Sequence, residues 1–150
     1  MSQDISFMRH ALALARRGLG QVAPNPSVGC VIVRDGRIVG RGWTQPGGRP
    51  HAEPVALADA GDAARGATVY VSLEPCAHHG ASPPCTDALI AAGVAKVVYA
   101  LRDPDPRVDG TGHTRLADAG IEVASGLLEK EAEELNRGFL TRIRKKRPFV

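Results

Sequence analysis

The chain has 150 residues, of which 43% are hydrophobic and 23% charged, as in an ordinary single globular domain. No apolar stretch reaches the roughly 20 residues of a membrane helix. The N-terminus, MSQDISFMRH, lacks the basic start and apolar core of a secretory signal. The net charge is only +3 and aromatic residues make up 4%, so a nucleic-acid surface is not expected. We therefore expect one domain over residues 1–150, in the cytoplasm and without membrane association.

Turn signals and apolar patterns divide the first half of the chain into a helix, a hairpin and a second helix. The first helix is expected over 7–19, capped by Ser6 or Asp4 and ended by Gly18 and Gly20. A Pro-rich loop leads to an apolar strand over 28–33, and Asp35-Gly36 is a typical two-residue hairpin turn before a strand over 37–43. The Ala-rich residues 51–60 favour the second helix.

Strands and helices alternate through the second half of the chain. Strands are expected over 67–73, 96–101 and 121–124, and helices over 86–92, 114–119 and from 127 to about 145. Alternation of this kind implies parallel pairing, with the hairpin at one edge. The fold class predicted is α/β, a three-layer α/β/α sandwich on a mixed sheet of about five strands.

Three residues along this pattern form the ligand set of a catalytic zinc site. His51 and Cys85 each open a predicted helix, and Cys76 follows a predicted strand within the sequence EPC. Zinc binds histidine nitrogen and cysteine thiolate, and a catalytic site keeps three protein ligands and leaves a fourth position for water. Helix N-termini also stabilise thiolates. Cys30, in contrast, lies within an apolar run and is expected to be a buried core thiol.

Glu53 lies two residues after His51, which is about 200° around a regular helix. Both side chains can face one metal only if His51 precedes the first helical residue. Glu53 is then expected to act as the general base toward water, and afterwards as the acid toward the ring nitrogen and the departing ammonia.

Four ordered motifs, APNPSVGCV, HAE, LEPCAHHGASPPCTDALI and RDPDPRVDGTG, resemble the riboflavin-biosynthesis deaminase family. The resemblance runs from about Phe7 to Val150 and implies a cytidine-deaminase-like fold with a bound Zn²⁺. It also implies hydrolytic deamination of 2,5-diamino-6-ribosylamino-4(3H)-pyrimidinone 5′-phosphate to 5-amino-6-ribosylaminouracil 5′-phosphate. The expected partner is this small phosphorylated substrate. Self-association stays open, as does a C-terminal reductase domain, which follows the deaminase in many bacterial members.

The resemblance further implies that Asn25 holds the substrate ring and that His78 approaches it. From the residues alone, Asn25 between two prolines is read as a turn residue rather than a ligand, and His78 is equally a loop-stabilising residue. Three family positions differ here: Thr44 replaces a frequent His, Ala81 a Lys or Arg, and Asp105 an amide. The phosphate contacts are therefore expected at other groups, namely Arg49, Arg107 and the backbone N–H groups around Gly110–Gly112, with Asp103 as a further substrate contact. Arg107 is equally readable as a solvated loop residue.

Two other functions remain open from the sequence. One is a different zinc deaminase, acting on cytosine, guanine or tRNA adenosine, although the eight residues between the cysteines argue against it. The other is a structural zinc module that binds a partner through the basic segment 142–147. A closed structural site has four protein ligands, and His78 is the one further residue that could complete it.

Overall fold

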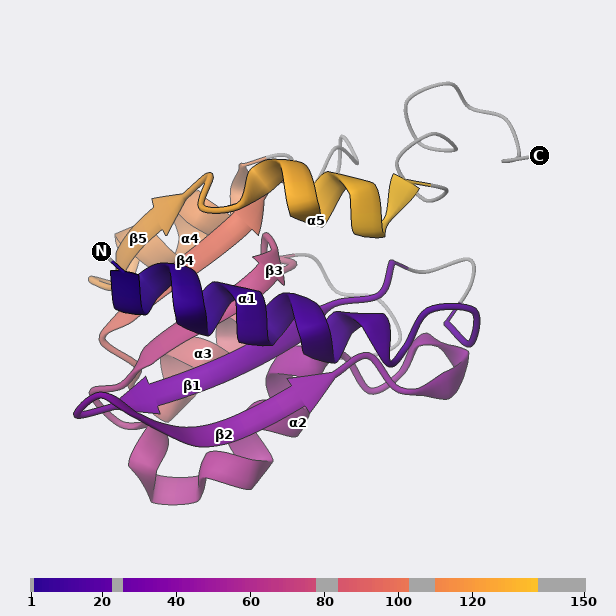
Figure 1. The fold of residues 1–150 in the computed structure, drawn as a ribbon. Helices are drawn as coiled ribbons and strands as arrows, with labels where there is room; N and C mark the ends of the chain where they lie inside the picture. Colours follow the sequence, from indigo (N-terminus) through magenta and orange to yellow (C-terminus); the bar gives the residue numbers. More distant parts are fainter. Residues whose placement is uncertain (1, 23–25, 78–83, 103–109, 138–150) are drawn as a thin grey trace.

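The computed structural model describes residues 2–22, 26–77, 84–102 and 110–137. Five strands form one sheet and are flanked by helices (Figure 1). In chain order the elements are α1 (Ser2–Arg16), β1 (Gly29–Arg34), β2 (Arg37–Trp43), α2 (Ala52–Ala60), β3 (Thr68–Leu73), α3 (Cys85–Ala92), β4 (Lys96–Leu101), α4 (Thr111–Asp118), β5 (Glu122–Ser125) and α5 (Glu129–Leu135). Two short 3-10 helices, η1 (Pro46–Gly48) and η2 (Gly61–Ala64), adjoin α2.

The sheet has the strand order β2-β1-β3-β4-β5. Strand β1 pairs antiparallel with β2 and β3, whereas β3, β4 and β5 run parallel. The predicted hairpin is confirmed: Asp35 and Gly36 both have positive φ, as this two-residue turn requires. The carboxyl ends of β3 and β4 therefore meet at one edge of the sheet, where α/β folds place reactive groups.

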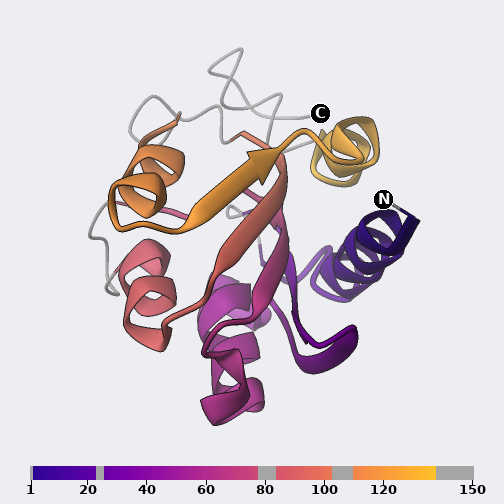
Figure 2. The same cartoon turned by 90° about the vertical axis from the view of Figure 1, so that its left-hand side faces the viewer.

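Helices cover both faces of the sheet. Figure 2 shows α1 and α5 on one face and α2, α3 and α4 on the other. The three central strands are almost entirely buried, which matches their near-continuous apolar sequences. The predicted three-layer α/β/α sandwich with a mixed five-stranded sheet is thus confirmed. No helix within the described residues has the length and apolarity needed to cross a membrane.

Two helix boundaries differ from the sequence-based expectation because tertiary contacts extend the helices. Helix α1 begins at Ser2, so Asp4 and Ser6 lie inside it and the predicted cap is wrong. Tyr70 on β3 donates a hydrogen bond to Asp4, and its ring lies 5.4 Å from that of Phe7, which anchors the first turns of α1. Helix α4 begins at Thr111 rather than 114 because the side chain of Glu74, the residue after β3, caps it, as described below.

The last predicted helix, from 127 to about 145, is shorter in the structure, because α5 ends at Leu135 and the Asn136 side chain bonds the Ser27 backbone instead. The part of the prediction beyond residue 137 lies outside the described residues.

A stability prediction arises where α1 crosses β1. A Cβ atom on Gly29 would lie 1.8 Å from the Ala11 carbonyl oxygen and 2.8 Å from the Ala15 nitrogen. Both are helix backbone atoms, so α1 would have to move away from the sheet. We expect Gly29→Ala to destabilise the fold by about 3 kcal/mol and to lower Tm by roughly 6–12 °C, measured by thermal denaturation. Ala13→Ser, at an exposed position of α1, should leave Tm nearly unchanged, and an unchanged Tm for Gly29→Ala would contradict this packing.

Candidate metal centre and substrate site

His51 stands immediately before helix α2. Its backbone is extended, with φ −70° and ψ 170°, and the helix begins at Ala52. This is the arrangement that allows His51 and Glu53 to face the same point, as the sequence predicts. Glu53, in the first turn of α2, is buried with 4% of its surface exposed.

The two cysteines come from the segment after β3 and from the first residue of α3. The backbone N–H of Cys85 donates to Cys76 Sγ at 3.4 Å, and the N–H of Thr86 donates to the Cys76 carbonyl oxygen at 3.1 Å. The N-terminus of α3 thus holds Cys76 by its thiol and by its backbone. The Cys85 N–H places partial positive charge against the Cys76 sulfur, which favours its thiolate.

His51, Cys76 and Cys85 bring one ligand atom each into a single cluster. These atoms all lie within 4.8 Å of one another, and His51 Nδ1 is 3.4 Å from Cys85 Sγ. Tetrahedral zinc bonds of about 2.0 Å to nitrogen and about 2.3 Å to sulfur would separate such a pair by about 3.5 Å. The donor atoms and their spacing therefore fit Zn²⁺ held by these three residues. Among the described residues no fourth metal-ligating side chain joins the cluster, and His78, the candidate fourth ligand, lies outside them.

The electrostatics of the cluster separate the two thiols. Hydrogen bonding to the Cys85 side chain, supported by His51 and the Cys85 backbone N–H, lowers the pKa of Cys76 to about 4. The same hydrogen bond, together with burial, raises the pKa of the Cys85 thiol. The hydrogen bond with Cys76 raises the pKa of His51. Thiolate character is therefore favoured at Cys76, and the charge of a bound dication would favour it at Cys85 as well.

Glu53 has the environment of a proton-transfer group. Burial, and then the negative charge of Cys76, raise the pKa of its carboxyl to about 7. A carboxyl near this value can both accept and release a proton at neutral pH. Cys30, by contrast, is fully buried in β1, and burial raises its pKa well above the ordinary range, as expected of a core thiol.

Of the predicted side-chain contacts to the substrate, only Arg49 lies among the residues that the structure describes. Arg49 is exposed, and its positive charge lowers the pKa of His51, so it lies near the cluster. Asn25, His78, Asp103 and Arg107 lie outside the described residues, as do the altered positions Ala81 and Asp105. Their roles stay predictions.

Thr44, which stands where the family often has a histidine, is part of the fold. It is buried, its Oγ1 accepts the Val28 N–H at 2.9 Å, and the Thr44 N–H donates to the Val28 carbonyl oxygen at 2.9 Å. Nearby, the side chain of Asn136 pairs with both the N–H and the carbonyl oxygen of Ser27, at 2.8 Å each. These buried contacts hold the chain directly after Asn25, and they leave Thr44 unavailable to a phosphate.

Two of the backbone N–H groups expected near the phosphate have another acceptor in the structure. The N–H groups of Gly110 and Gly112 donate to the carboxylate of Glu74, at 3.1 and 3.0 Å. They are therefore satisfied within the protein and do not await an anion. The sequence analysis missed Glu74, and the signal that could have found it is an acid between an apolar strand and the Pro75-Cys76 pair.

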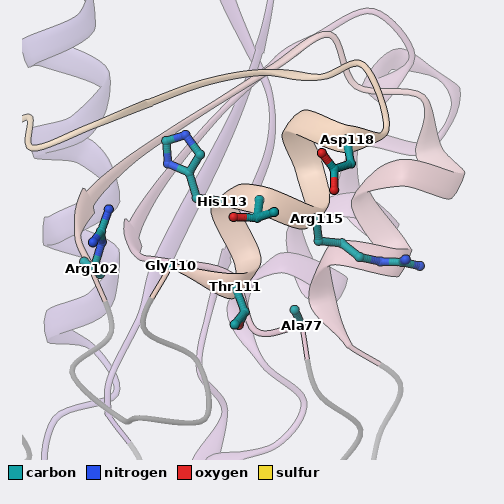
Figure 3. Close-up of a pocket in the computed structure, with 8 residues that line it drawn as sticks. Ala77, Arg102, Gly110, Thr111, His113, Arg115 and Asp118 are labelled. Carbon is teal, nitrogen blue, oxygen red and sulfur yellow. The ribbon is translucent and has the colours of Figure 1, made fainter.

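A depression of about 660 Å³ has Ala77, the residue that follows Cys76, in its lining (Figure 3). Arg102, which follows β4, and Gly110 and Thr111, at the start of α4, also line it. Arg115 extends away toward α3, where it forms an ion pair with Asp87 at 2.8 Å. The remaining lining residues are His113, Thr114 and Asp118.

Comparison with known proteins agrees with this site. Residues 1–101 match the family described as the cytidine and deoxycytidylate deaminase zinc-binding region. The chain belongs to this family. The matched residues include all three members of the cluster and Glu53.

The resemblance to riboflavin-biosynthesis deaminases is also confirmed. The chain is 58% identical to the riboflavin biosynthesis protein RibD of Escherichia coli K12, over 99% of this chain and 40% of that protein. It is 48% identical to a diaminohydroxyphosphoribosylamino-pyrimidine deaminase of Buchnera aphidicola, over 94% of this chain and 96% of that protein. The structure of Acinetobacter baumannii RibD superposes with a TM-score of 0.96 at 51% identity, covering 99% of this chain and 42% of that one. The chain thus spans about two fifths of its longer relatives.

Proposed function

We propose that this chain catalyses the zinc-dependent hydrolytic deamination of 2,5-diamino-6-ribosylamino-4(3H)-pyrimidinone 5′-phosphate. The observation that carries the proposal is the buried Glu53 beside the His51, Cys76 and Cys85 cluster. The Buchnera relative, which has nearly the same length as this chain, is named for this deaminase activity and supports the substrate.

His51, Cys76 and Cys85 hold the metal in this proposal, two as thiolates and one as a neutral imidazole. A bound zinc ion would act as a Lewis acid and make water nucleophilic near neutral pH. Glu53 takes a proton from the attacking water and delivers it to the ring nitrogen. A second proton passes through the same carboxylate to the amino group, which leaves as ammonia. Burial of Glu53 keeps these transfers away from bulk solvent.

Arginine side chains near the depression hold the substrate phosphate in this proposal. Arg49 lies near the metal ligands, Arg102 lines the depression, and Arg107 follows in the sequence. Guanidinium groups bind phosphate through paired, charge-assisted hydrogen bonds, which suits this task.

Substitution of these arginines should weaken binding of the phosphorylated substrate selectively. We expect Arg49→Ala and Arg107→Ala each to raise its KM about tenfold or more, the factor that corresponds to a lost hydrogen bond to a charged group. The KM of the dephosphorylated analogue should change little. Arg9→Ala, at an exposed position of α1, is the matched control. If neither variant alters the ratio of the two KM values, the phosphate is held elsewhere.

The longer relatives suggest how the domain is used. A Thermotoga maritima structure with a TM-score of 0.93 is described as a deaminase and reductase in one chain. A reductase domain or a separate reductase acting on the deaminated product fits this arrangement. We also propose that the protein is cytoplasmic, which cell fractionation tests. Self-association stays open, and the molecular mass measured in solution tests it.

Substrate comparison separates this function from its nearest alternative. Purified zinc-loaded protein is incubated with the diaminopyrimidine phosphate, cytidine and guanine, and ammonia release is measured. Turnover of the first compound alone supports the proposal, whereas preferential turnover of another base points to a different zinc deaminase. No turnover of any base by fully zinc-loaded protein would favour a structural zinc module.

A further inference from the structure

Glu74, at the carboxyl end of β3, is a buried acid that belongs to neither the metal cluster nor the proton-transfer machinery. Its carboxylate accepts three backbone hydrogen bonds from the start of α4. Gly110 N–H donates to Oε1 at 3.1 Å, while Gly112 and His113 N–H groups donate to Oε2 at 3.0 and 3.2 Å. The first N–H groups of a helix have no partner within it, and Gly110 has no side chain to cap them. Glu74, which lies 36 residues before Gly110 and directly after β3, supplies that cap.

The backbone of Glu74 makes a second connection. Its N–H donates to the carbonyl oxygen of Leu101, the last residue of β4, at 2.9 Å. One residue therefore holds the chain at Leu101 through its backbone and at Gly110 through its side chain. The predicted substrate contacts Asp103 and Arg107 lie between these two points in the sequence.

The start of α4 also packs directly on the segment that leads to Cys76. A Cβ atom on Gly112 would lie 2.0 Å from the Pro75 carbonyl oxygen, so the helix approaches as closely as a glycine allows. A Cβ atom on Gly110 would lie 3.8 Å from Arg102 Cζ, so the guanidinium rests beside the residue that Glu74 holds. In Figure 3 Arg102, Gly110 and Thr111 border the depression together.

The metal ligands have supports of their own. Cys76 is held by the N–H groups of Cys85 and Thr86. His51 directly precedes α2, and the three side-chain hydrogen bonds of Glu74 described above go to α4 and its cap, not to α2. Loss of the Glu74 carboxylate should therefore disturb the Arg102 and Gly110 side of the site and leave the metal cluster in place.

We propose that Glu74 is a positioning residue that sets substrate affinity, because it fixes the end of β4 and the start of α4 on the phosphate side of the site. This inference rests on the proposed function for its substrate. It assigns Glu74 a role in KM rather than in kcat or in zinc binding.

The test compares Glu74→Gln and Glu74→Ala with the unchanged protein, all loaded with zinc. Glutamine keeps the size but only one acceptor oxygen, so some contacts survive. We expect zinc content to stay at about one per chain and kcat to change little, while KM for the phosphorylated substrate rises about tenfold for alanine and less for glutamine. KM for the dephosphorylated analogue should rise less. Hydrogen exchange at the Gly110, Gly112 and His113 amides should accelerate, since their acceptor is lost.

Glu122→Gln is the matched control. It removes the exposed ion pair between Glu122 on β5 and Lys96 at the start of β4, neither of which lines the depression, and it should alter neither the KM values nor exchange at the three amides. Unchanged KM values and protected amides in both Glu74 variants would overturn the inference, as would loss of zinc with an unchanged KM. If the unchanged protein does not deaminate this substrate, the proposed function fails, whereas amide exchange and zinc content still test the positioning role.

Discussion

Replacing Glu53 with glutamine is expected to lower kcat by roughly 10²–10⁴-fold, the contribution of a well-placed general acid and base. Glutamine keeps the volume of this buried side chain and removes its ability to accept a proton. Because Glu53 is separate from the three ligand atoms, the variant should keep about one zinc per chain. Steady-state kinetics and elemental analysis of the same preparation measure both quantities.

Substrate binding by the Glu53→Gln variant should be retained, since glutamine keeps the size of the side chain and can still form a hydrogen bond with the ring. Glu131→Gln, an exposed position on α5, makes the same chemical change outside the site and should keep full activity. If the Glu53→Gln protein turns over substrate nearly as fast as the unsubstituted protein, Glu53 is not the proton shuttle.

Loss of either ligand cysteine is expected to abolish zinc binding and, with it, turnover. Cys76→Ser and Cys85→Ser replace a thiolate with a hydroxyl that stays protonated at neutral pH and is a poor zinc ligand. Zinc should fall from about one per chain to nearly none when each variant is purified without added metal. Since metal binding stabilises only the folded state, Tm should also fall and should no longer respond to added zinc.

The third cysteine provides the control for this experiment. Cys30 lies in β1, fully buried and apart from the cluster, so Cys30→Ala should keep its zinc even if packing costs some stability. Full zinc in either Cys76→Ser or Cys85→Ser, or loss of zinc in Cys30→Ala, would contradict the ligand assignment.

Local sequence was sufficient to predict the features that depend on neighbouring residues. Asp35-Gly36 predicts its hairpin because both turn positions need positive φ, which these residue types tolerate. The spacing of His51 and Glu53 predicts a helix that begins between them, and Pro84 before Cys85 predicts the start of α3. Alternating strands and helices predict the parallel half of the sheet and hence the edge at which Cys76 emerges. In each case the determining interactions span only a few residues of the chain.

Other features depend on partners that are far apart in sequence, and only the tertiary structure decides them. Glu74 is an ordinary acid in the sequence, and it becomes the cap of α4 because the parallel pairing of β3 and β4 brings residues 36 positions apart together. The same holds for Asn136, whose side chain hydrogen-bonds the backbone N–H and carbonyl oxygen of Ser27, 109 residues earlier in the chain. Thr44 stands where the family often has a histidine. In the structure its hydroxyl oxygen accepts a hydrogen bond from the backbone N–H of Val28, the residue before β1. Hydrogen-bond partners of buried groups are chosen by proximity in space, and no local pattern encodes that proximity.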